Sequence, residues 1–160
     1  MRIGVLHPGE MGVSVCQALS DSGHEVLWVK QGRSPATEER GKPFRAVQSV
    51  PTLVAEVEGI VSVCPPDAAL EMAQEVAATG YSGPYVDANA VSPMTAQAIA
   101  SVIGANFVDG GIIGPPALRP GTTRMYVSGE RAADVVSWFN KGHLDVRSVG
   151  AGLDRASTLK

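Results

Sequence analysis

The sequence predicts an α/β fold in which helices cover both faces of a doubly wound, mostly parallel sheet. Three observations support this prediction. Short apolar runs, typical of buried strands, alternate with amphipathic segments whose apolar residues recur at helical spacing. Clusters of glycine and proline separate these segments. The 160 residues are enough for one domain with a substantial core. In such a sheet, ligands are expected beside the carboxyl ends of the strands.

Each predicted element rests on its own local pattern. The apolar or β-branched runs expected to form strands are residues 2–7, 25–29, 44–47, 59–64, 85–88, 106–109, 123–128 and 144–149. The segments expected to form helices are residues 10–22, 36–40, 51–57, 67–79, 92–103 and 131–140. Ser92 and Pro93 are typical of a helix start, and Gly23 is typical of a helix end. Residues 110–121 are rich in glycine and proline and are expected to form a loop.

Composition and charge argue against several classes of protein. The net charge of −3 disfavours a nucleic-acid coat, because such proteins carry a strongly basic face. No apolar stretch approaches the roughly 18 residues that a membrane span requires. No basic segment precedes the first predicted strand, so we expect no secretory signal and a cytoplasmic location. Cys16 and Cys64 are expected to be reduced thiols, and the scattered histidines predict no metal site.

A glycine-containing turn directly follows the first predicted strand. It consists of His7, Pro8, Gly9, Glu10, Met11 and Gly12. Gly9 and Gly12 match the second and third glycines of the G-x-G-x-x-G pattern, and His7 replaces the first. Gly9 would let the backbone approach a pyrophosphate at the helix N-terminus, and Gly12 would let the helix pack closely on the sheet. The strand–turn–helix context predicts a Rossmann-type dinucleotide site. A tight turn without a ligand is the alternative.

The end of the second predicted strand bears on the choice between NAD and NADP. An NAD site usually carries Asp or Glu about 20 residues after the glycine pattern, where it binds the ribose 2′-hydroxyl. Here residues 29–34 contain no acid, and Lys30, Arg33 and Ser34 could bind a 2′-phosphate instead. The sequence therefore predicts NADP(H) as the preferred cofactor, with NAD(H) possible. The alternative is a solvated basic loop.

Several strings together resemble the β-hydroxyacid dehydrogenase superfamily, which includes 6-phosphogluconate and 3-hydroxyisobutyrate dehydrogenases. The matching strings are IGVLHPGEMG at residues 3–12, SGHEV at 22–26, VSVCPP at 61–66, YVDANAVSP at 85–93, FVDGGIIGPP at 107–116 and GTTRMYVSG at 121–129. They extend along the whole chain and are most similar to a branch of 6-phosphogluconate-dehydrogenase-like, NAD(P)-binding proteins. Imine reductases are a related branch.

The resemblance implies a domain organisation. Residues 1–152 would form the NAD(P)-binding Rossmann domain, and residues 153–160 would begin a linker helix. That helix would lead to a C-terminal helical domain absent from this chain. Subunits would pair as homodimers through the helical domain, and the active site would lie between the domains.

The resemblance also assigns catalytic and cofactor-binding residues. Cys64, Pro65 and Pro66 would line the adenosine-ribose side of the cofactor. Asn89 takes the place of a Ser or Thr near the nicotinamide and would orient substrate or carboxamide by hydrogen bonds. Lys160 matches a catalytic lysine on the helix after the last strand, where burial would lower its pKa for general acid/base catalysis. An ordinary solvated lysine is the alternative.

A further implied site concerns the substrate. The segment 109–116 corresponds to a loop that binds the substrate carboxylate in relatives, where it ends in Ser-Gly-Gly. Its candidate substrate-binding residues are Gly111, Ile112, Ile113 and Gly114. Ile113 stands where relatives carry the serine, which removes a hydroxyl that would contact a hydroxyacid. The usual substrate class is therefore in question.

Together these features predict the cofactor-binding half of an NADP-dependent oxidoreductase. Hydride would pass between the nicotinamide and a small hydroxyacid, carbonyl or imine, while the protein positions the cofactor and excludes water. A stand-alone module that senses dinucleotides without catalysis is the main alternative. An interaction domain with a degenerate pocket is less favoured, because Gly9 and Gly12 persist beside a basic loop. Neither nucleic acid nor membrane is an expected partner.

Overall fold

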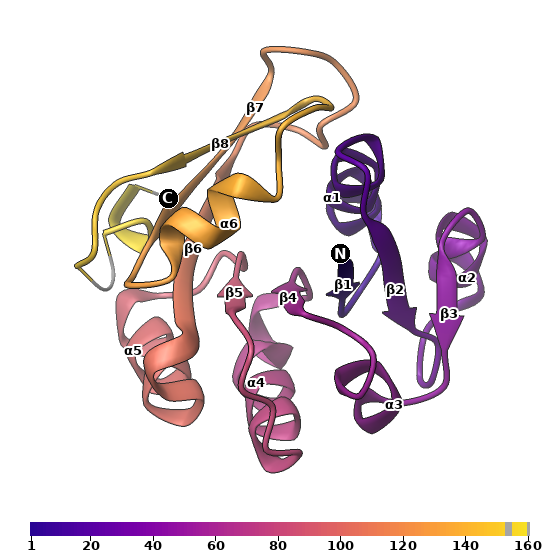
Figure 1. Cartoon of the computed structure of the whole chain (residues 1–160), viewed down its shortest axis with the longest axis horizontal. Coiled ribbons are helices and arrows are strands. Elements are labelled where there is room, and N and C mark those ends of the chain that lie inside the picture. Colours follow the sequence, from indigo (N-terminus) through magenta and orange to yellow (C-terminus); the bar gives the residue numbers. More distant parts are fainter. Residues whose placement is uncertain (153–154, 160) are drawn as a thin grey trace.

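A computed structural model describes residues 1–152 and 155–159 of the chain. Within these residues, eight strands form one sheet in the order β3-β2-β1-β4-β5-β6-β7-β8 (Figure 1). The strands are β1 (Arg2–Val5), β2 (Glu25–Val29), β3 (Arg45–Val47), β4 (Gly59–Ser62), β5 (Tyr85–Asp87), β6 (Phe107–Ile113), β7 (Thr123–Ser128) and β8 (Leu144–Ser148). Neighbouring strands are parallel except for β6 and β7, which pair antiparallel. The predicted mostly parallel sheet is confirmed.

Helices cover both faces of this sheet. The α-helices are α1 (Glu10–Asp21), α2 (Pro35–Gly41), α3 (Val50–Val54), α4 (Ala69–Ala78), α5 (Pro93–Ile103) and α6 (Ala132–Ser137), and the 3₁₀ turns are η1 (Pro66–Ala68), η2 (Gly104–Asn106) and η3 (Ser157–Leu159). One hydrophobic core lies under α1 and α6 and buries Leu19 and Trp138. A second core lies under α3, α4 and α5 and buries Leu53 and Ile99. Figure 1 shows the two helix groups on opposite sides of the sheet, as a doubly wound fold requires.

Three of these helices begin in the same way. Ser34, Ser49 and Ser92 lie at the N-caps of α2, α3 and α5. Each hydroxyl accepts a hydrogen bond from the backbone N–H three residues later, at 3.2, 3.4 and 3.1 Å respectively. A proline lies at the first or second position of each helix. The predicted cap at Ser92 is confirmed. Helix α1 differs, because its N-cap is Gly9, which has no side-chain acceptor.

The prediction of a loop over residues 110–121 is wrong at its beginning. Strand β6 continues to Ile113, so that Gly111, Ile112 and Ile113 pair with β7. β-Branched residues favour extended backbone, and the antiparallel neighbour satisfies the backbone N–H and C=O groups. Residues expected in a substrate loop therefore begin as part of a strand, and Gly114 is the first residue beyond it.

Other predicted elements are present with shifted ends. The β4 strand stops at Ser62, and the N–H of Cys64 bonds to the Asn89 side chain instead of to a neighbouring strand. Helix α6 ends at Ser137, before the predicted residue 140, and the N–H groups of residues 140 and 141 bond to the hydroxyl of Ser22. Residues 153–160, expected to begin a helix, include the η3 turn. Leu153, Asp154 and Lys160 lie outside the described residues.

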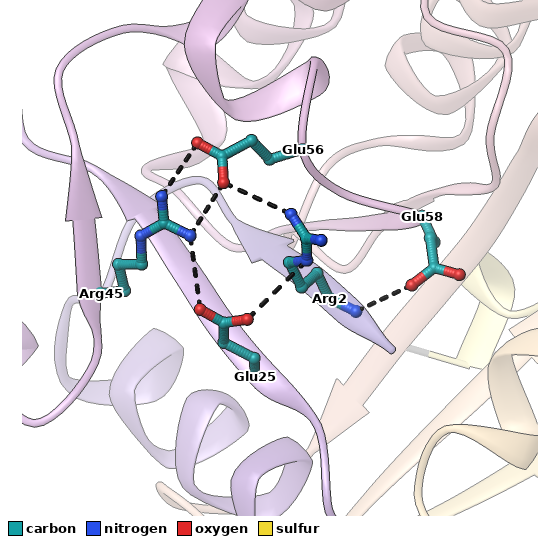
Figure 2. Close-up of polar contacts among 5 residues, drawn as sticks. All are labelled: Arg2, Glu25, Arg45, Glu56 and Glu58. Carbon is teal, nitrogen blue, oxygen red and sulfur yellow. Dashed lines mark hydrogen bonds and ion pairs between the residues drawn. The ribbon is translucent and has the colours of Figure 1, made fainter.

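Ion pairs connect the amino ends of neighbouring strands (Figure 2). Arg2, Glu25 and Arg45 are the first residues of β1, β2 and β3, and Glu56 and Glu58 precede β4. The Nη1 of Arg45 lies 2.8 Å from Glu56 Oε2 and 3.4 Å from Glu25 Oε1. The Nη1 of Arg2 lies 3.5 Å from Glu56 Oε2, and its Nε lies 3.8 Å from Glu25 Oε2. The backbone N–H of Arg2 donates to Glu58 Oε2 at 3.0 Å. This network lies at the edge of the sheet opposite to the carboxyl ends of the strands.

Candidate functional site

The turn between β1 and α1 lies at the carboxyl edge of the parallel strands. The N–H of Gly9 donates to the His7 carbonyl at 2.9 Å, and the N–H of Val13 donates to the Gly9 carbonyl at 2.8 Å. The N–H groups of the first three helical residues have no acceptor within the helix. Gly9 supplies no side chain to accept one of them. Helix α1 therefore presents backbone donors, and the positive end of its dipole, to an incoming anion.

The two glycines of the turn have different structural roles. A Cβ at Gly12 would collide with the carbonyl oxygen of His7, so glycine permits α1 to pack closely against the turn. The backbone of Gly9 is extended, with φ −67° and ψ −167°, and other residues can adopt this conformation. Among the described residues, a Cβ at Gly9 would meet only the His7 ring, at 3.3 Å. The space outside Gly9 is otherwise open, as the approach of a pyrophosphate requires.

Two arginines face this turn. The Nη2 of Arg33 donates to the Leu6 carbonyl at 3.1 Å, and its Nε is buried without a hydrogen-bond partner among the described residues. The pKa of His7 is lowered by burial and then by the charges of Arg33 and Arg40. Arg40 also forms an ion pair with Glu10 at 3.5 Å. The buried Nε of Arg33 is therefore a hydrogen-bond donor without an acceptor among the described residues, and it lies in a region of positive charge.

Lys30 and Ser34, both predicted to bind a 2′-phosphate, have partners within the protein. The Nζ of Lys30 lies 3.6 Å from the Glu38 carboxylate. The Ser34 hydroxyl accepts from the Thr37 N–H and donates to the Thr37 hydroxyl, each at 3.2 Å. Sequence reasoning missed Glu38 and Arg40 as candidate site residues. The Ser-Pro start of α2 places Glu38 in its first turn, but no local pattern shows that α2 folds back toward Lys30.

Asn89 joins the ends of β4 and β5. It is 2% exposed. Its Oδ1 accepts from the Cys64 N–H at 2.6 Å, and its Nδ2 donates to Ser62 Oγ at 3.1 Å and to Asp87 Oδ1 at 2.5 Å. The amide of Asn89 therefore fixes the backbone of the segment predicted to line the cofactor. In the same segment, burial is the largest cause that raises the pKa of the Cys64 thiol, which favours its protonated form.

A cavity of about 510 Å³ opens beside this amide. Its described lining consists of Met11, Val63, Cys64, Pro66, Ala88, Asn89, Ala90, Ile112, Ile113, Gly114 and Leu159. No charged side chain is present in this described lining. The cavity brings together predicted cofactor residues with predicted substrate residues 112–114. Gly111, which is buried within β6, and Pro65 are not part of this described lining. The role predicted for Lys160 falls outside the described residues.

Residues 1–152 and 155–159 contain no group of three or more His, Cys, Asp or Glu side chains that could hold a metal ion. None of their helices is long and apolar enough to cross a membrane.

Comparison with known proteins identifies a family. Residues 2–135 match the family of the NAD-binding domain of 6-phosphogluconate dehydrogenase. No curated protein matches the sequence. Among solved structures, a conserved protein of unknown function with structural similarity to 3-hydroxyacid dehydrogenases shares 27% identity, with a TM-score of 0.87. An imine reductase from Myxococcus stipitatus, in complex with NAD+, shares 22% identity with a TM-score of 0.76. A Mycobacterium tuberculosis 3-hydroxyisobutyrate dehydrogenase shares 19% sequence identity with this chain, with a TM-score of 0.80.

These three likenesses each cover 99% of this chain. The chain spans 61% of the first structure and 57% of each of the other two. The two likenesses below 25% identity show the shared fold. The family match includes the turn at Gly9, the basic segment after β2 and the strands that frame the cavity. The resemblance inferred from the sequence strings is therefore confirmed.

Proposed function

Because the chain belongs to the family of NAD-binding domains of 6-phosphogluconate dehydrogenase, we propose that it is the cofactor-binding half of an NADP-dependent oxidoreductase. The observation that carries this proposal is the uncapped N-terminus of α1 at Gly9, beside the buried Arg33 Nε that has no partner among the described residues. Both features fit a dinucleotide. Its pyrophosphate would accept from the N–H groups of α1 and from Arg33. The bound nicotinamide would supply the hydride chemistry.

NADP(H) is the preferred cofactor in this proposal, and NAD(H) is also accepted. Lys30 is the first residue after β2, where the adenosine ribose of a bound dinucleotide carries its 2′ group. Arg33 and Arg40 add positive charge at the neighbouring turn. Ser34 can contribute a hydrogen bond only by giving up its bond to Thr37 Oγ1.

The cavity beside Asn89 is proposed to receive the nicotinamide and a small hydroxyacid, carbonyl or imine. Cys64 and Pro66 line it toward the cofactor, and Ile112 and Ile113 line it toward the substrate. These largely apolar walls would exclude water from the reacting atoms. An isoleucine in place of the serine of relatives favours the uncharged members of this substrate set. Lys160 is proposed to exchange a proton with the substrate oxygen or nitrogen.

The rest of the enzyme is proposed to be a helical domain that follows residue 152 and through which two subunits pair. The solved relatives support a longer protein, since this chain spans 57–61% of their lengths. Ile113 and Leu159 line the cavity and are 43% and 48% exposed, so a further domain would cover them. We place such an enzyme in the cytoplasm.

Titration calorimetry of this chain with NADPH and with NADH tests the proposal. We expect both to bind, with NADPH the tighter ligand. The substitution Arg33→Ala should weaken NADPH binding by about 1.5–3 kcal/mol, the contribution of a hydrogen bond to a charged group. The loss for NADH should be similar, because Arg33 lies over the turn that would hold the pyrophosphate, which both cofactors carry. The control Arg147→Ala removes an exposed arginine that pairs with Asp145 and should change neither affinity. Failure of the parent chain to bind either dinucleotide would refute the proposal.

A further inference from the structure

We infer that Glu38 sets the cofactor preference of this chain by competing with a 2′-phosphate for Lys30. The inference rests on the proposed dinucleotide function and goes beyond it to a residue that controls selectivity. Its basis is the juxtaposition of two elements. Lys30 immediately follows β2, and Glu38 of α2 brings its carboxylate to 3.6 Å from the Lys30 Nζ. Residues 29–34 contain no acid, so the next helix supplies the carboxylate that the end of the strand lacks.

The backbones on both sides of this pair are anchored. The N–H of Lys30 donates to the Val47 carbonyl at 2.8 Å, which ties the end of β2 to β3. The N–H of Glu38 donates to the Ser34 carbonyl at 3.0 Å, at the capped start of α2. Thr37, next to Glu38, is 4% exposed and holds this turn of α2 against the protein. The meeting of Lys30 and Glu38 is therefore a consequence of the fold.

A ligand can reach both side chains. The Lys30 side chain is 47% exposed and the Glu38 side chain is 39% exposed. Exposed pairs of this kind interact weakly in water, so a phosphate dianion can displace the carboxylate from Lys30. The displaced carboxylate stays within a Debye length of the phosphate and is therefore still repelled by it.

Glu38 and Lys30 consequently act in opposite directions on the two cofactors. Lys30 attracts the 2′-phosphate of NADP(H), and Glu38 repels it. The 2′-hydroxyl of NAD(H) is neutral and can donate a hydrogen bond to the Glu38 carboxylate, as it does to the acid of an ordinary NAD site. Glu38 therefore moderates the preference for NADP(H) that the basic loop alone would give.

The arginines of the site do not discriminate in this way. Arg33 bonds to the Leu6 carbonyl, and Arg40 pairs with Glu10 at the start of α1. Both arginines thus face the turn that would hold the pyrophosphate, a group common to the two cofactors. The discrimination between NADP(H) and NAD(H) therefore depends on Lys30 and Glu38.

The test is calorimetric titration of the 160-residue chain with NADP+ and with NAD+ at fixed ionic strength. The variant Glu38→Gln keeps the shape of the side chain and removes its charge. Lys30→Met removes the opposing charge. The matched control Glu39→Gln alters the adjacent residue, whose carboxylate pairs with Lys42 where both side chains are 70% exposed. Thermal melting establishes that each variant is folded.

The ratio of the NAD+ dissociation constant to the NADP+ dissociation constant is the quantity to compare. Glu38→Gln should raise this ratio by about threefold or more, and Lys30→Met should lower it by a similar factor. Glu39→Gln should leave it within about twofold of the parent value. If both dinucleotides bind and Glu38→Gln does not change the ratio, the inference is overturned while the proposed function stands. An equal shift in Glu39→Gln would also overturn it, because the effect would then be one of net charge. Binding of neither dinucleotide by the parent would instead refute the proposed function, and this inference with it.

Discussion

The side-chain oxygen of Asn89 accepts a hydrogen bond from the backbone N–H of Cys64 at 2.6 Å. The same amide donates to Asp87 at 2.5 Å and to Ser62 at 3.1 Å. Oδ1 is therefore engaged with the backbone of the segment that lines the cavity, and Nδ2 is engaged with the strands below. This geometry fits a positioning role for Asn89, which holds the Cys64 segment that we propose lines the cofactor. Direct contact of its amide with substrate or carboxamide stays a prediction from the sequence.

Asn89→Asp should convert this arrangement into one that depends on pH. The introduced carboxylate cannot donate to Asp87, and two adjacent buried carboxylates would raise the pKa of one of them. A carboxyl group whose pKa is raised in the folded state makes the fold less stable as pH rises from its unfolded pKa through its folded pKa, because the folded state binds the proton more tightly than the unfolded state does. We expect a loss of about 2–4 kcal/mol in unfolding free energy near pH 8, partly recovered near pH 5.

Urea denaturation at both pH values measures this effect. Asn140→Asp places the same new charge at an exposed position and serves as the control. The interpretation fails if the two variants show the same dependence on pH. A gain of dinucleotide affinity toward pH 5 that is larger in Asn89→Asp than in the parent chain would tie the amide to the cofactor segment.

Substitutions of the two turn glycines should separate binding from stability. Gly9→Val fits the extended backbone and places its side chain in the open space outside the turn, so dinucleotide binding should be lost while the fold survives. Gly12→Ala brings a Cβ onto the His7 carbonyl and should destabilise the fold by about 1–3 kcal/mol. Circular dichroism melting and a binding titration on each variant would distinguish them. Unchanged binding by Gly9→Val would place the ligand elsewhere.

Much of the fold could be predicted from sequence because its signals are local. Buried parallel strands are continuous apolar runs, and the Ser92–Pro93 pair marks a helix start without reference to the rest of the chain. The glycine at position 12 was also predicted for the right physical reason, since it lies against the His7 carbonyl. These features need only neighbouring residues to be interpreted.

The features that the sequence did not predict depend on distant partners. The continuation of β6 through Ile113 requires β7 as an antiparallel neighbour, and the Gly/Pro content of the segment suggested a loop. The pairing of Lys30 with Glu38 depends on the path of α2. The bond between Asn89 and Cys64 joins residues 25 positions apart, and the parallel pairing of β4 with β5 brings them together.

Removal of Arg45 should weaken the ion-pair network at the amino edge of the sheet. Arg45 contacts both Glu25 and Glu56, so Arg45→Met leaves these two carboxylates side by side with fewer positive charges (Figure 2). Since the network is exposed, we expect the melting temperature to fall by only about 1–3 °C at low salt. The difference in melting temperature between variant and parent should shrink at roughly 0.5 M NaCl, because salt then screens charges that are more than a few ångströms apart. The control Arg147→Met removes one of the two arginines that pair with Asp145, leaving Arg124 at 3.7 Å from it, and should have less effect. A fall in the melting temperature of Arg45→Met that does not depend on salt would instead indicate lost packing of the Arg45 side chain.

His7 lies where a bound anion would change its protonation. Burial lowers its pKa in the free chain, and the nearby positive charges of Arg33 and Arg40 lower it further. Since its folded pKa lies below the ordinary value of 6.5, the unfolded chain binds more protons, and His7 reduces stability as pH falls through this range. A pyrophosphate at the turn would neutralise the arginine charges and so raise the pKa of His7 again.

Dinucleotide binding should therefore take up a proton and become tighter as pH falls from about 7.5 to about 5.5, by roughly two- to tenfold. NAD+ is the appropriate ligand, because a 2′-phosphate would itself titrate near pH 6, roughly as other phosphate monoesters do. Calorimetry in two buffers of different ionisation enthalpy counts the protons taken up. His7→Gln should abolish this uptake, whereas His143→Gln, an exposed histidine outside the site, should preserve it. Proton uptake that persists in His7→Gln would assign it to another group, and its absence in the parent would mean that the anion does not bind beside this turn.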